Sequence, residues 1–133
     1  MKILDHKLYY FLGVGGIGMS ALARYFHHYG KDVRGYDKTN TALTSELEKE
    51  GIHCHYEEDV AGLQKIFSRY QPSDILVVYT PAIPADNKEF IYLQENGFKL
   101  LKRSQVLGEI TRQFRTIAIA GTHGKTTTTT LVT

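Results

Sequence analysis

Short apolar runs alternate along the chain with longer segments in which apolar residues recur at helical spacing. Short continuous apolar runs are typical of buried strands, and a period between three and four residues is typical of helices. We expect six strands, within residues 8–15, 32–37, 52–56, 74–79, 98–102 and 116–121. We expect helices between and after them, within residues 17–30, 41–50, 60–70, 87–97 and 104–114.

Polar residues and glycines mark where several of these helices begin and end. Thr41 or Thr44 can cap the second helix and Asn87 the fourth, because short polar side chains accept hydrogen bonds from the free amides of a first turn. Gly30 and Gly51 follow the first two helices, where glycine commonly ends a helix. Local signals therefore delimit these elements.

The regular alternation of strand and helix predicts a parallel sheet with helices on both faces, because each connection must cross over before the next strand can pair. The predicted fold is α/β and Rossmann-like, and its ligands are expected beyond the carboxyl ends of the strands. A polar stretch at residues 113–116 is the expected linker. It divides residues 1–112, the first domain, from residues 113–133, the first strand and phosphate loop of a second domain.

Composition narrows the classes of function without selecting one. The chain has 133 residues, enough for one domain with a core, and its 42% apolar and 23% charged residues are typical of a soluble globular protein. The net charge of +2, without a dense basic cluster, argues against a nucleic-acid partner, and the apolar runs are too short to cross a membrane. A single cysteine, Cys54, suits a reducing compartment, so we expect a cytoplasmic protein.

The first glycine loop follows the first strand and opens the first helix. Gly13, Gly15 and Gly18 have the spacing G-x-G-x-x-G, and Gly16 is a fourth glycine within it. Without a Cβ, glycine lets a diphosphate approach the backbone, where free amides and the positive end of the helix dipole attract the anion. The alternative is a turn needed only for close helix–strand packing. The position between a strand and a helix favours a nucleotide diphosphate.

Asp37 adds to this site from the end of the second strand. It lies about 20 residues after the glycine loop, where an acidic side chain commonly contacts a ribose hydroxyl. The loop and the acid leave open whether the ligand is a dinucleotide or another nucleotide. His53 and His55 share a strand face, but two ligands without a third nearby do not make a metal site.

A second glycine loop, residues 121–127, again follows an apolar run. Its amides would surround phosphates, the Lys125 ammonium would reach the outer phosphates, and the Thr126 hydroxyl would bind Mg²⁺. Ile119 occupies the position of the first glycine in the usual spacing of such loops. The alternative is a solvated helix start, which is disfavoured because the five consecutive threonines are poor helix formers.

The two loops, in this order, resemble those of the Mur ligases of peptidoglycan synthesis. The resemblance rests on "GVGGIGMSALA" (residues 13–23) and "AGTHGKTTTT" (residues 120–129). It extends over nearly the whole chain through "YTPAIPADN" (residues 79–87) and "KRSQVLGEI" (residues 102–110). His123 is typical of members that add L-alanine or recycle a peptide, whereas later ligases of the pathway usually have asparagine. The family's own phosphate loop lacks the first glycine, so Ile119 is compatible with it.

The resemblance implies an ATP-dependent ligase that joins L-alanine to the carboxylate of UDP-N-acetylmuramate through an acyl phosphate. Such enzymes use ATP and Mg²⁺, and they have an N-terminal domain for the UDP sugar, a central ATPase domain and a C-terminal domain for the amino acid. Residues 113–133 would be only the start of the central domain, whose remainder, with the C-terminal domain, is missing here. The chain alone is therefore expected to bind UDP-N-acetylmuramate weakly or partially and to have no ligase activity.

The resemblance also implies a role for particular residues. The diphosphate would lie on the first loop, Asp37 near the ribose or uracil, and the residues after the fourth strand beside the nucleotide. The expected UDP-sugar residues are Gly13, Gly15, Gly16, Ile17, Gly18, Asp37, Thr80, Ala82 and Ile83. Arg103 is a candidate for positioning the substrate, with an exposed arginine at the start of a helix as the alternative. The expected ATP residues are Gly121, Thr122, His123, Gly124, Lys125, Thr126 and Thr127, with Lys125 and Thr126 catalytic and Thr126 holding Mg²⁺.

Two other functions stay open. A recycling ligase attaches a ready-made peptide to the same UDP sugar, and "GIGMSALA" favours the alanine-adding enzyme over it. A free-standing NAD-binding regulatory module fits the first loop and Asp37, but it leaves the loop at residues 121–127 without a role.

Overall fold

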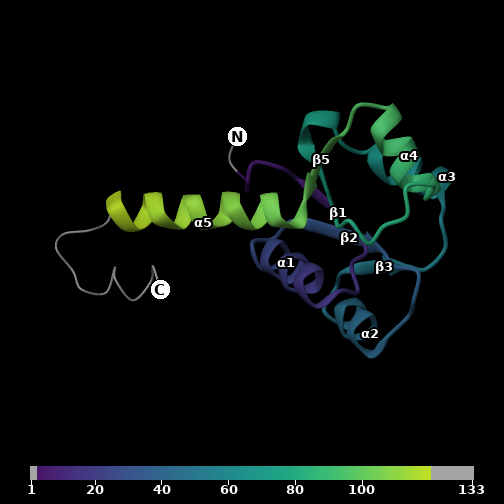
Figure 1. The fold of residues 1–133 in the computed structure, drawn as a ribbon, viewed down its shortest axis with the longest axis horizontal. Coiled ribbons are helices and arrows are strands. Elements are labelled where there is room, and N and C mark those ends of the chain that lie inside the picture. The colour runs from purple at the N-terminus through teal and green to yellow at the C-terminus, as the bar shows by residue number, and fades with distance from the viewer. Residues whose placement is uncertain (1–2, 121–133) are drawn as a thin grey trace.

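The computed structural model describes residues 3–120, in which five parallel strands form one sheet (Figure 1). The strands are β1 (Leu8–Leu12), β2 (Asp32–Tyr36), β3 (His53–His55), β4 (Ile75–Tyr79) and β5 (Lys99–Lys102). Their order in the sheet is β3-β2-β1-β4-β5, and every neighbouring pair is parallel. The predicted α/β, Rossmann-like fold is confirmed.

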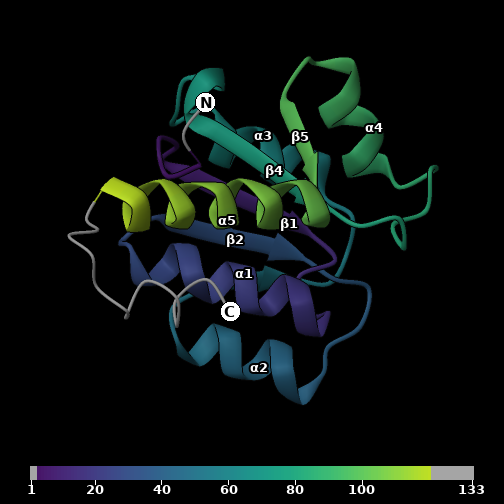
Figure 2. The same ribbon diagram turned by 60° about the vertical axis from the view of Figure 1, so that its left-hand side comes forward.

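Helices cover both faces of this sheet (Figure 2). On one face lie α1 (Ile17–His28), α2 (Ala42–Lys49) and α5 (Arg103–Ala120), and on the other lie α3 (Val60–Phe67) and α4 (Lys88–Glu95). A short 3-10 helix (Pro72–Asp74) leads into β4. The chain moves outward from β1 to β3 and then in the opposite direction through β4 to β5. Because crossovers are right-handed, this reversal places α3 and α4 opposite α1 and α2.

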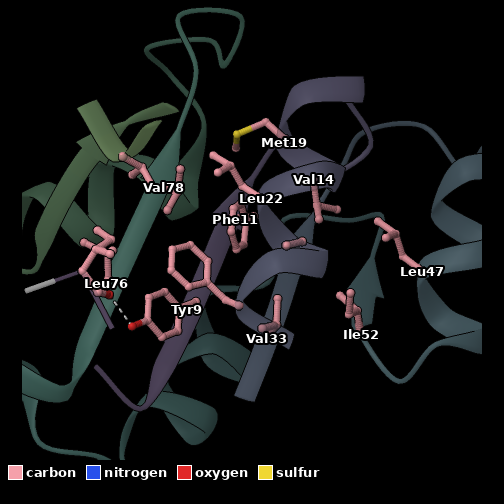
Figure 3. Packing of buried hydrophobic residues seen from close by; sticks show 14 of the residues in the cluster. Tyr9, Phe11, Val14, Met19, Leu22, Val33, Leu47, Ile52, Leu76 and Val78 are labelled. Atoms are coloured by element: carbon pink, nitrogen blue, oxygen red, sulfur yellow. Dashed lines mark hydrogen bonds between the residues drawn. The ribbon is translucent and has the colours of Figure 1, made fainter. Parts of the chain in front are cut away.

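The central strand β1 is buried along its whole length, between two neighbouring strands and two layers of helices. Successive side chains of a strand point to opposite faces. Tyr9 and Phe11 therefore pack on the side of α1 (Figure 3), where the ring of Phe26 stacks on Tyr9 with centroids 4.0 Å apart. Tyr10 points to the other side, into the core beneath α3 and α4. The sheet thus separates two cores.

The predicted helix boundaries agree with the structure where capping residues define them. Thr41, rather than Thr44, caps α2, and the two residues form a capping box in which each hydroxyl accepts from the other's amide, at 3.3 and 2.8 Å. Asn87 caps α4 by accepting from the amide three residues later, at 3.0 Å. Gly30 and Gly51 follow α1 and α2 with φ of +77° and +101°, the left-handed conformation that ends many helices.

The last helix corrects the prediction for residues 113–120. Residues 116–120 were expected to begin a sixth strand and residues 113–116 to form a linker, but both belong to α5. A strand needs a neighbour to pair its backbone groups, and among residues 3–120 none of the five strands pairs with this segment. A helix satisfies the same groups within one segment. The expected sixth strand is therefore wrong, and α5 runs out beyond the sheet (Figure 1).

Candidate functional site

A cleft of about 670 Å³ opens beyond the carboxyl ends of β1 and β4. The chain changes direction across the sheet between these two strands, which is where open parallel sheets bind ligands. The volume lies within the range of small-molecule sites, roughly 300–1,000 Å³. The cleft is lined by Gly13, Gly16, Gly18, Met19, Tyr36, Asp37, Lys38, Glu58, Thr80, Ala82, Ile83, Pro84, Asp86, Asn87 and Arg103.

The first wall of the cleft is the glycine loop, residues 13–18. Gly13 has a φ of +97°, which side-chain-bearing residues rarely adopt. Its amide and that of Val14 both donate to the Tyr36 carbonyl, at 2.7 and 3.0 Å, so the loop is tied to the end of β2. Gly16 precedes α1 and has no side chain with which to cap it. The first amides of α1 and the positive end of its dipole are therefore suited to an anionic ligand.

Asp37 holds this loop in position. Its Oδ2 accepts from the Gly15 amide at 2.8 Å, and its Oδ1 accepts from the Thr39 amide at 3.0 Å. A Cβ on Gly15 would lie 2.8 Å from Asp37 Oδ2 and 2.9 Å from Thr44 Cγ2, so glycine is required for this close approach. Each carboxylate oxygen has a further lone pair. Asp37 can therefore also accept a hydrogen bond from a ligand hydroxyl in the cleft.

A second close contact brings the loop onto β2. A Cβ on Gly35 would lie 2.6 Å from the Cβ of Val14 and 2.8 Å from its Cγ2. Val14 is fully buried, so its side chain has little room to move away. The sequence analysis missed Gly35, because a single glycine within a strand has no spacing that distinguishes it from others.

The second wall of the cleft is the loop after β4, residues 80–87. The Ile83 amide donates to the Thr80 carbonyl at 3.1 Å, and the Asn87 amide donates to the Pro84 carbonyl at 3.1 Å, so two tight turns shape the loop. Asn87 is buried, and it both lines the cleft and caps α4. This wall therefore ends where α4 begins.

Charged side chains of both signs line the cleft. Arg103 lies against the first turn of α1, since a Cβ on Gly18 would be 2.8 Å from its Nη1. Lys38 adds a second cation directly after Asp37. Glu58 and Asp86 contribute acids from the loops after β3 and β4. The cations and the free amides of α1 together provide a suitable environment for phosphate groups.

Most of the predicted UDP-sugar residues come together at this cleft. Gly15 and Ile17 are the exceptions, because Gly15 packs against Asp37 and Ile17 is 86% exposed. The predicted residues that line the cleft are Gly13, Gly16, Gly18, Asp37, Thr80, Ala82 and Ile83. The predicted ATP residues all lie outside the described residues: Gly121, Thr122, His123, Gly124, Lys125, Thr126 and Thr127.

Several residues of the cleft were not predicted from the sequence. Lys38 had a signal, because it directly follows Asp37 at the end of a strand. Asn87 was identified only as a helix cap, although a cap at the carboxyl side of the sheet also faces the ligand site. Glu58 had no signal, because only the folded chain brings the loop after β3 to the cleft. The other missed residues are Met19, Tyr36, Pro84 and Asp86.

Outside the cleft, residues 3–120 contain neither a metal site nor a membrane-spanning helix. His53 and His55 lie on β3, and over residues 3–120 no group of three or more His, Cys, Asp or Glu side chains is placed to hold a metal ion. Within that same part of the chain, every helix is too short or too polar to cross a membrane. Burial raises the pKa of the Cys54 thiol to about 11, so this thiol is protonated at neutral pH.

Comparison with protein families and curated proteins identifies relatives of the chain. Residues 8–115 match the family described as "Mur ligase family, catalytic domain". The UDP-N-acetylmuramate–L-alanine ligases of Porphyromonas gingivalis W83 and Christiangramia forsetii are 53% and 50% identical to the chain. These matches cover 95% and 99% of this chain but only 27% and 29% of the relatives, so the chain spans a little more than a quarter of their length.

Solved structures with the same fold include two kinds of ligase. A UDP-N-acetylmuramate–alanine ligase from Thermotoga maritima matches with a TM-score of 0.68 at 27% identity, over 82% of this chain and 24% of that one. A murein peptide ligase from Psychrobacter arcticus matches with a TM-score of 0.67 at 25% identity, over 82% and 22%. Because the two scores are nearly equal, the fold of this part does not distinguish between the two kinds.

Proposed function

Because the chain belongs to the Mur ligase family, we propose that residues 1–112 are the UDP-sugar-binding domain of a ligase that joins L-alanine to UDP-N-acetylmuramate. The observation that carries the proposal is the cleft at β1 and β4, which combines a glycine loop at a helix start, an acid directly after β2 and two cations. Relatives with this activity in their name are 50–53% identical to the chain over 95–99% of its length.

The diphosphate of the UDP sugar binds at the first wall. Gly13, Gly16 and Gly18 leave the backbone open to the phosphates, and the first amides of α1 donate to them. Arg103 and Lys38, which both line the cleft, supply positive charge. Gly15 acts indirectly, by holding Asp37 in place, and Ile17 is the exposed first residue of α1, at the edge of the site.

The uridine binds between Asp37 and the second wall. The Asp37 carboxylate accepts a hydrogen bond from the ribose with the lone pairs that the Gly15 and Thr39 amides leave free. Thr80, Ala82 and Ile83 flank the nucleotide from the loop after β4. The two walls thus hold different parts of one ligand.

Residues 113–133 begin the ATP-binding domain in this proposal, with α5 running across the boundary. Support comes from the sequence Gly124-Lys125-Thr126, in which Lys125 binds the outer phosphates of ATP and Thr126 holds Mg²⁺. Lys125 and the Mg²⁺ ion held by Thr126 would stabilise the negative charge on the phosphates of ATP. In this proposal, the L-alanine site and the remaining domains lie in the part of the relatives that this chain does not span. We place the activity in the cytoplasm, in agreement with a single cysteine, Cys54.

A peptide-recycling ligase is the second candidate, because the fold resembles the murein peptide ligase nearly as closely as the alanine ligase. Both ligases act on a UDP-N-acetylmuramate derivative, so they share the cleft and differ in the amine that they add. A protein carrying the remaining domains decides between them. ADP release that depends on L-alanine supports the first candidate, and release that depends on a peptide supports the second.

Isothermal titration of the chain tests the binding function itself. We expect UDP-N-acetylmuramate to bind, UDP to bind more weakly, and NAD not to bind. Gly16→Ala is the informative variant, because its Cβ lies at least 3.7 Å from other atoms and so disturbs the ligand rather than the fold. Binding of NAD in place of UDP-N-acetylmuramate would overturn the proposal and support the regulatory module.

A further inference from the structure

A buried carboxylate, Glu89, lies in α4, on the sheet face opposite α1. It is the second residue of α4 and is 0% exposed. Its Oε2 accepts from His55 Nε2 at 2.8 Å and from the Asp59 amide at 2.9 Å, and its Oε1 accepts from the Tyr10 hydroxyl. These partners come from β1, from β3 and from the start of α3. One side chain therefore joins four elements.

The Glu89 carboxyl group is an acceptor among donors. The Asp59 amide and the Tyr10 hydroxyl donate to its two oxygens, and His55 Nε2 lies 2.8 Å from Oε2 and 3.1 Å from the Tyr10 hydroxyl oxygen. Burial and the neighbouring Glu89 raise the pKa of Tyr10 well above its ordinary value, so the phenol remains a donor. The first turn of α4 adds the positive end of a helix dipole. These groups together surround both carboxyl oxygens of Glu89 inside the core.

Hydrogen bonds also connect the loop after β3 with the start of α4. The Asp59 amide belongs to the loop after β3, and it donates to Glu89 at the start of α4. In the opposite sense, the Lys88 amide at the start of α4 donates to Glu58 Oε1 in the loop after β3, at 2.5 Å. Glu58 itself lines the cleft. The two segments therefore hold each other through a reciprocal pair of hydrogen bonds.

The second wall ends at this pair. Asn87 is its last residue, caps α4 and precedes Glu89 by two positions. A shift of the first turn of α4 would therefore move Asn87 and Asp86, which line the cleft. Well-packed apolar residues often replace buried charges without loss of stability. Directional bonds, however, fix the position of a segment in a way that apolar packing does not.

We propose that Glu89 is a positioning residue for the cleft. Its carboxylate sets where the second wall stands relative to the glycine loop, and the affinity for the UDP sugar depends on that distance. The inference rests on the proposed function, since it takes UDP-N-acetylmuramate as the ligand. Glu89 is not among the residues that line the cleft, so it acts through Asn87 at the end of the second wall and through the Asp59 amide, whose neighbour Glu58 lines the cleft.

Three variants test the positioning role by titration with UDP-N-acetylmuramate. Glu89→Leu keeps most of the volume but removes both acceptor oxygens, and Glu89→Gln keeps one oxygen for the Asp59 amide. Phe26→Leu is the matched control, because Phe26 is fully buried near the far end of α1 and its ring packs against those of Tyr9, Phe11 and Tyr25. We expect affinity to fall by about tenfold or more in Glu89→Leu and by less in Glu89→Gln, because misplaced site residues lose binding steeply. Phe26→Leu should bind as the original chain does, even though it unfolds more easily.

Amide hydrogen exchange of the ligand-free chain provides a second readout. In Glu89→Leu, the Asp59 and Lys88 amides and those of residues 80–87 should exchange faster than in Phe26→Leu. If Glu89→Leu does not fold, Glu89→Gln and Tyr10→Phe take its place in both measurements. Unchanged affinity and unchanged exchange in the Glu89 variants would overturn the inference. Failure of the original chain to bind would instead count against the proposed function, and the exchange rates would still decide whether Glu89 positions the wall.

Discussion

The two walls of the cleft are held in place by opposite means. The first wall, residues 13–18, depends on missing side chains: Gly15 fits against Asp37 and Thr44 only because it has no Cβ, and Gly35 leaves room for Val14 in the same way. The second wall, residues 80–87, depends on side chains that are present, since the Glu89 carboxylate holds its end through donors from β1, β3 and α3.

This difference shows how each wall responds to change. A wall made by close backbone approach is disturbed by adding a single methyl group, and the disturbance is steric and local. A wall held by a buried carboxylate is disturbed by removing an acceptor, which leaves several donors unsatisfied at once. Variants of Glu89, of Gly15 and Gly16 and of Tyr9 and Tyr10 should separate these two modes, with the largest effect expected from Glu89, and His6 provides a reference site away from both walls.

Removing the carboxylate should have the largest effect on stability. Glu89→Ala leaves the Tyr10 hydroxyl and the Asp59 amide without their acceptor and opens a cavity, so we expect a loss of about 3 kcal/mol in the free energy of unfolding. Urea denaturation followed by circular dichroism measures it. Glu95→Ala in the same helix is the control, because Glu95 is exposed and its loss should change stability by less than about 0.5 kcal/mol. Similar losses in the two variants would contradict this account of the second wall.

Adding a methyl group should distinguish two neighbouring glycines of the first wall. Gly15→Ala should cost about 1–2 kcal/mol, because its Cβ would lie under 3.0 Å from both Asp37 and Thr44. Gly16→Ala should change stability by less than about 0.5 kcal/mol, since its nearest contact would be an ordinary 3.7 Å. Thermal and urea unfolding of the two variants are the measurement. Equal stability of the two variants would mean that Asp37 and Thr44 move aside, and it would contradict the requirement for glycine at position 15.

Two adjacent tyrosines allow a matched comparison of hydroxyl groups. Tyr9 and Tyr10 are both fully buried, but the Tyr9 hydroxyl donates to the Ile3 carbonyl, whereas the Tyr10 hydroxyl donates to Glu89. Each hydroxyl has two polar partners, since the Tyr9 oxygen also accepts from the His6 amide and the Tyr10 oxygen lies 3.1 Å from His55 Nε2, so each change to phenylalanine should cost about 1–2 kcal/mol of stability. Only Tyr10→Phe should also weaken binding of UDP-N-acetylmuramate in a titration. Equal binding by both variants would separate Tyr10 from the second wall.

The smallest effect should come from His6, which lies away from both walls. Burial lowers the pKa of His6 below its ordinary value of 6.5, even though the Ser73 carbonyl accepts from its ring at 3.2 Å. The unfolded chain therefore binds this proton more readily than the folded one, and folding stability is lost as pH falls below 6.5 toward the folded pKa. Comparing urea unfolding of the original chain and His6→Gln at pH 7 and pH 5 should show a smaller pH effect in the variant. The same pH effect in both would rule out His6 as its source.

Sequence reasoning predicted the first wall better than the second for a physical reason. The glycine loop follows β1 directly, and its glycines lie close together in the sequence, so their spacing can be recognised. The caps Thr41 and Asn87 can be recognised in the same way, from the helical residues that follow them. Glu89, in contrast, resembles an ordinary acidic residue in the first turn of a helix. Its main partner, Tyr10, lies 79 positions away in the chain, and no spacing rule connects the two.

By itself, the sequence determined the alternation of strands and helices, hence the parallel sheet, and the position of a glycine loop at its carboxyl edge. These features follow from hydrophobic periodicity and from the backbone freedom of glycine, which act between near neighbours. The tertiary structure alone decided that Asp37 holds the loop, that Gly35 must be small and that Glu89 is buried among donors. It also decided that residues 116–120 extend α5, because a strand, unlike a helix, exists only where another strand lies beside it.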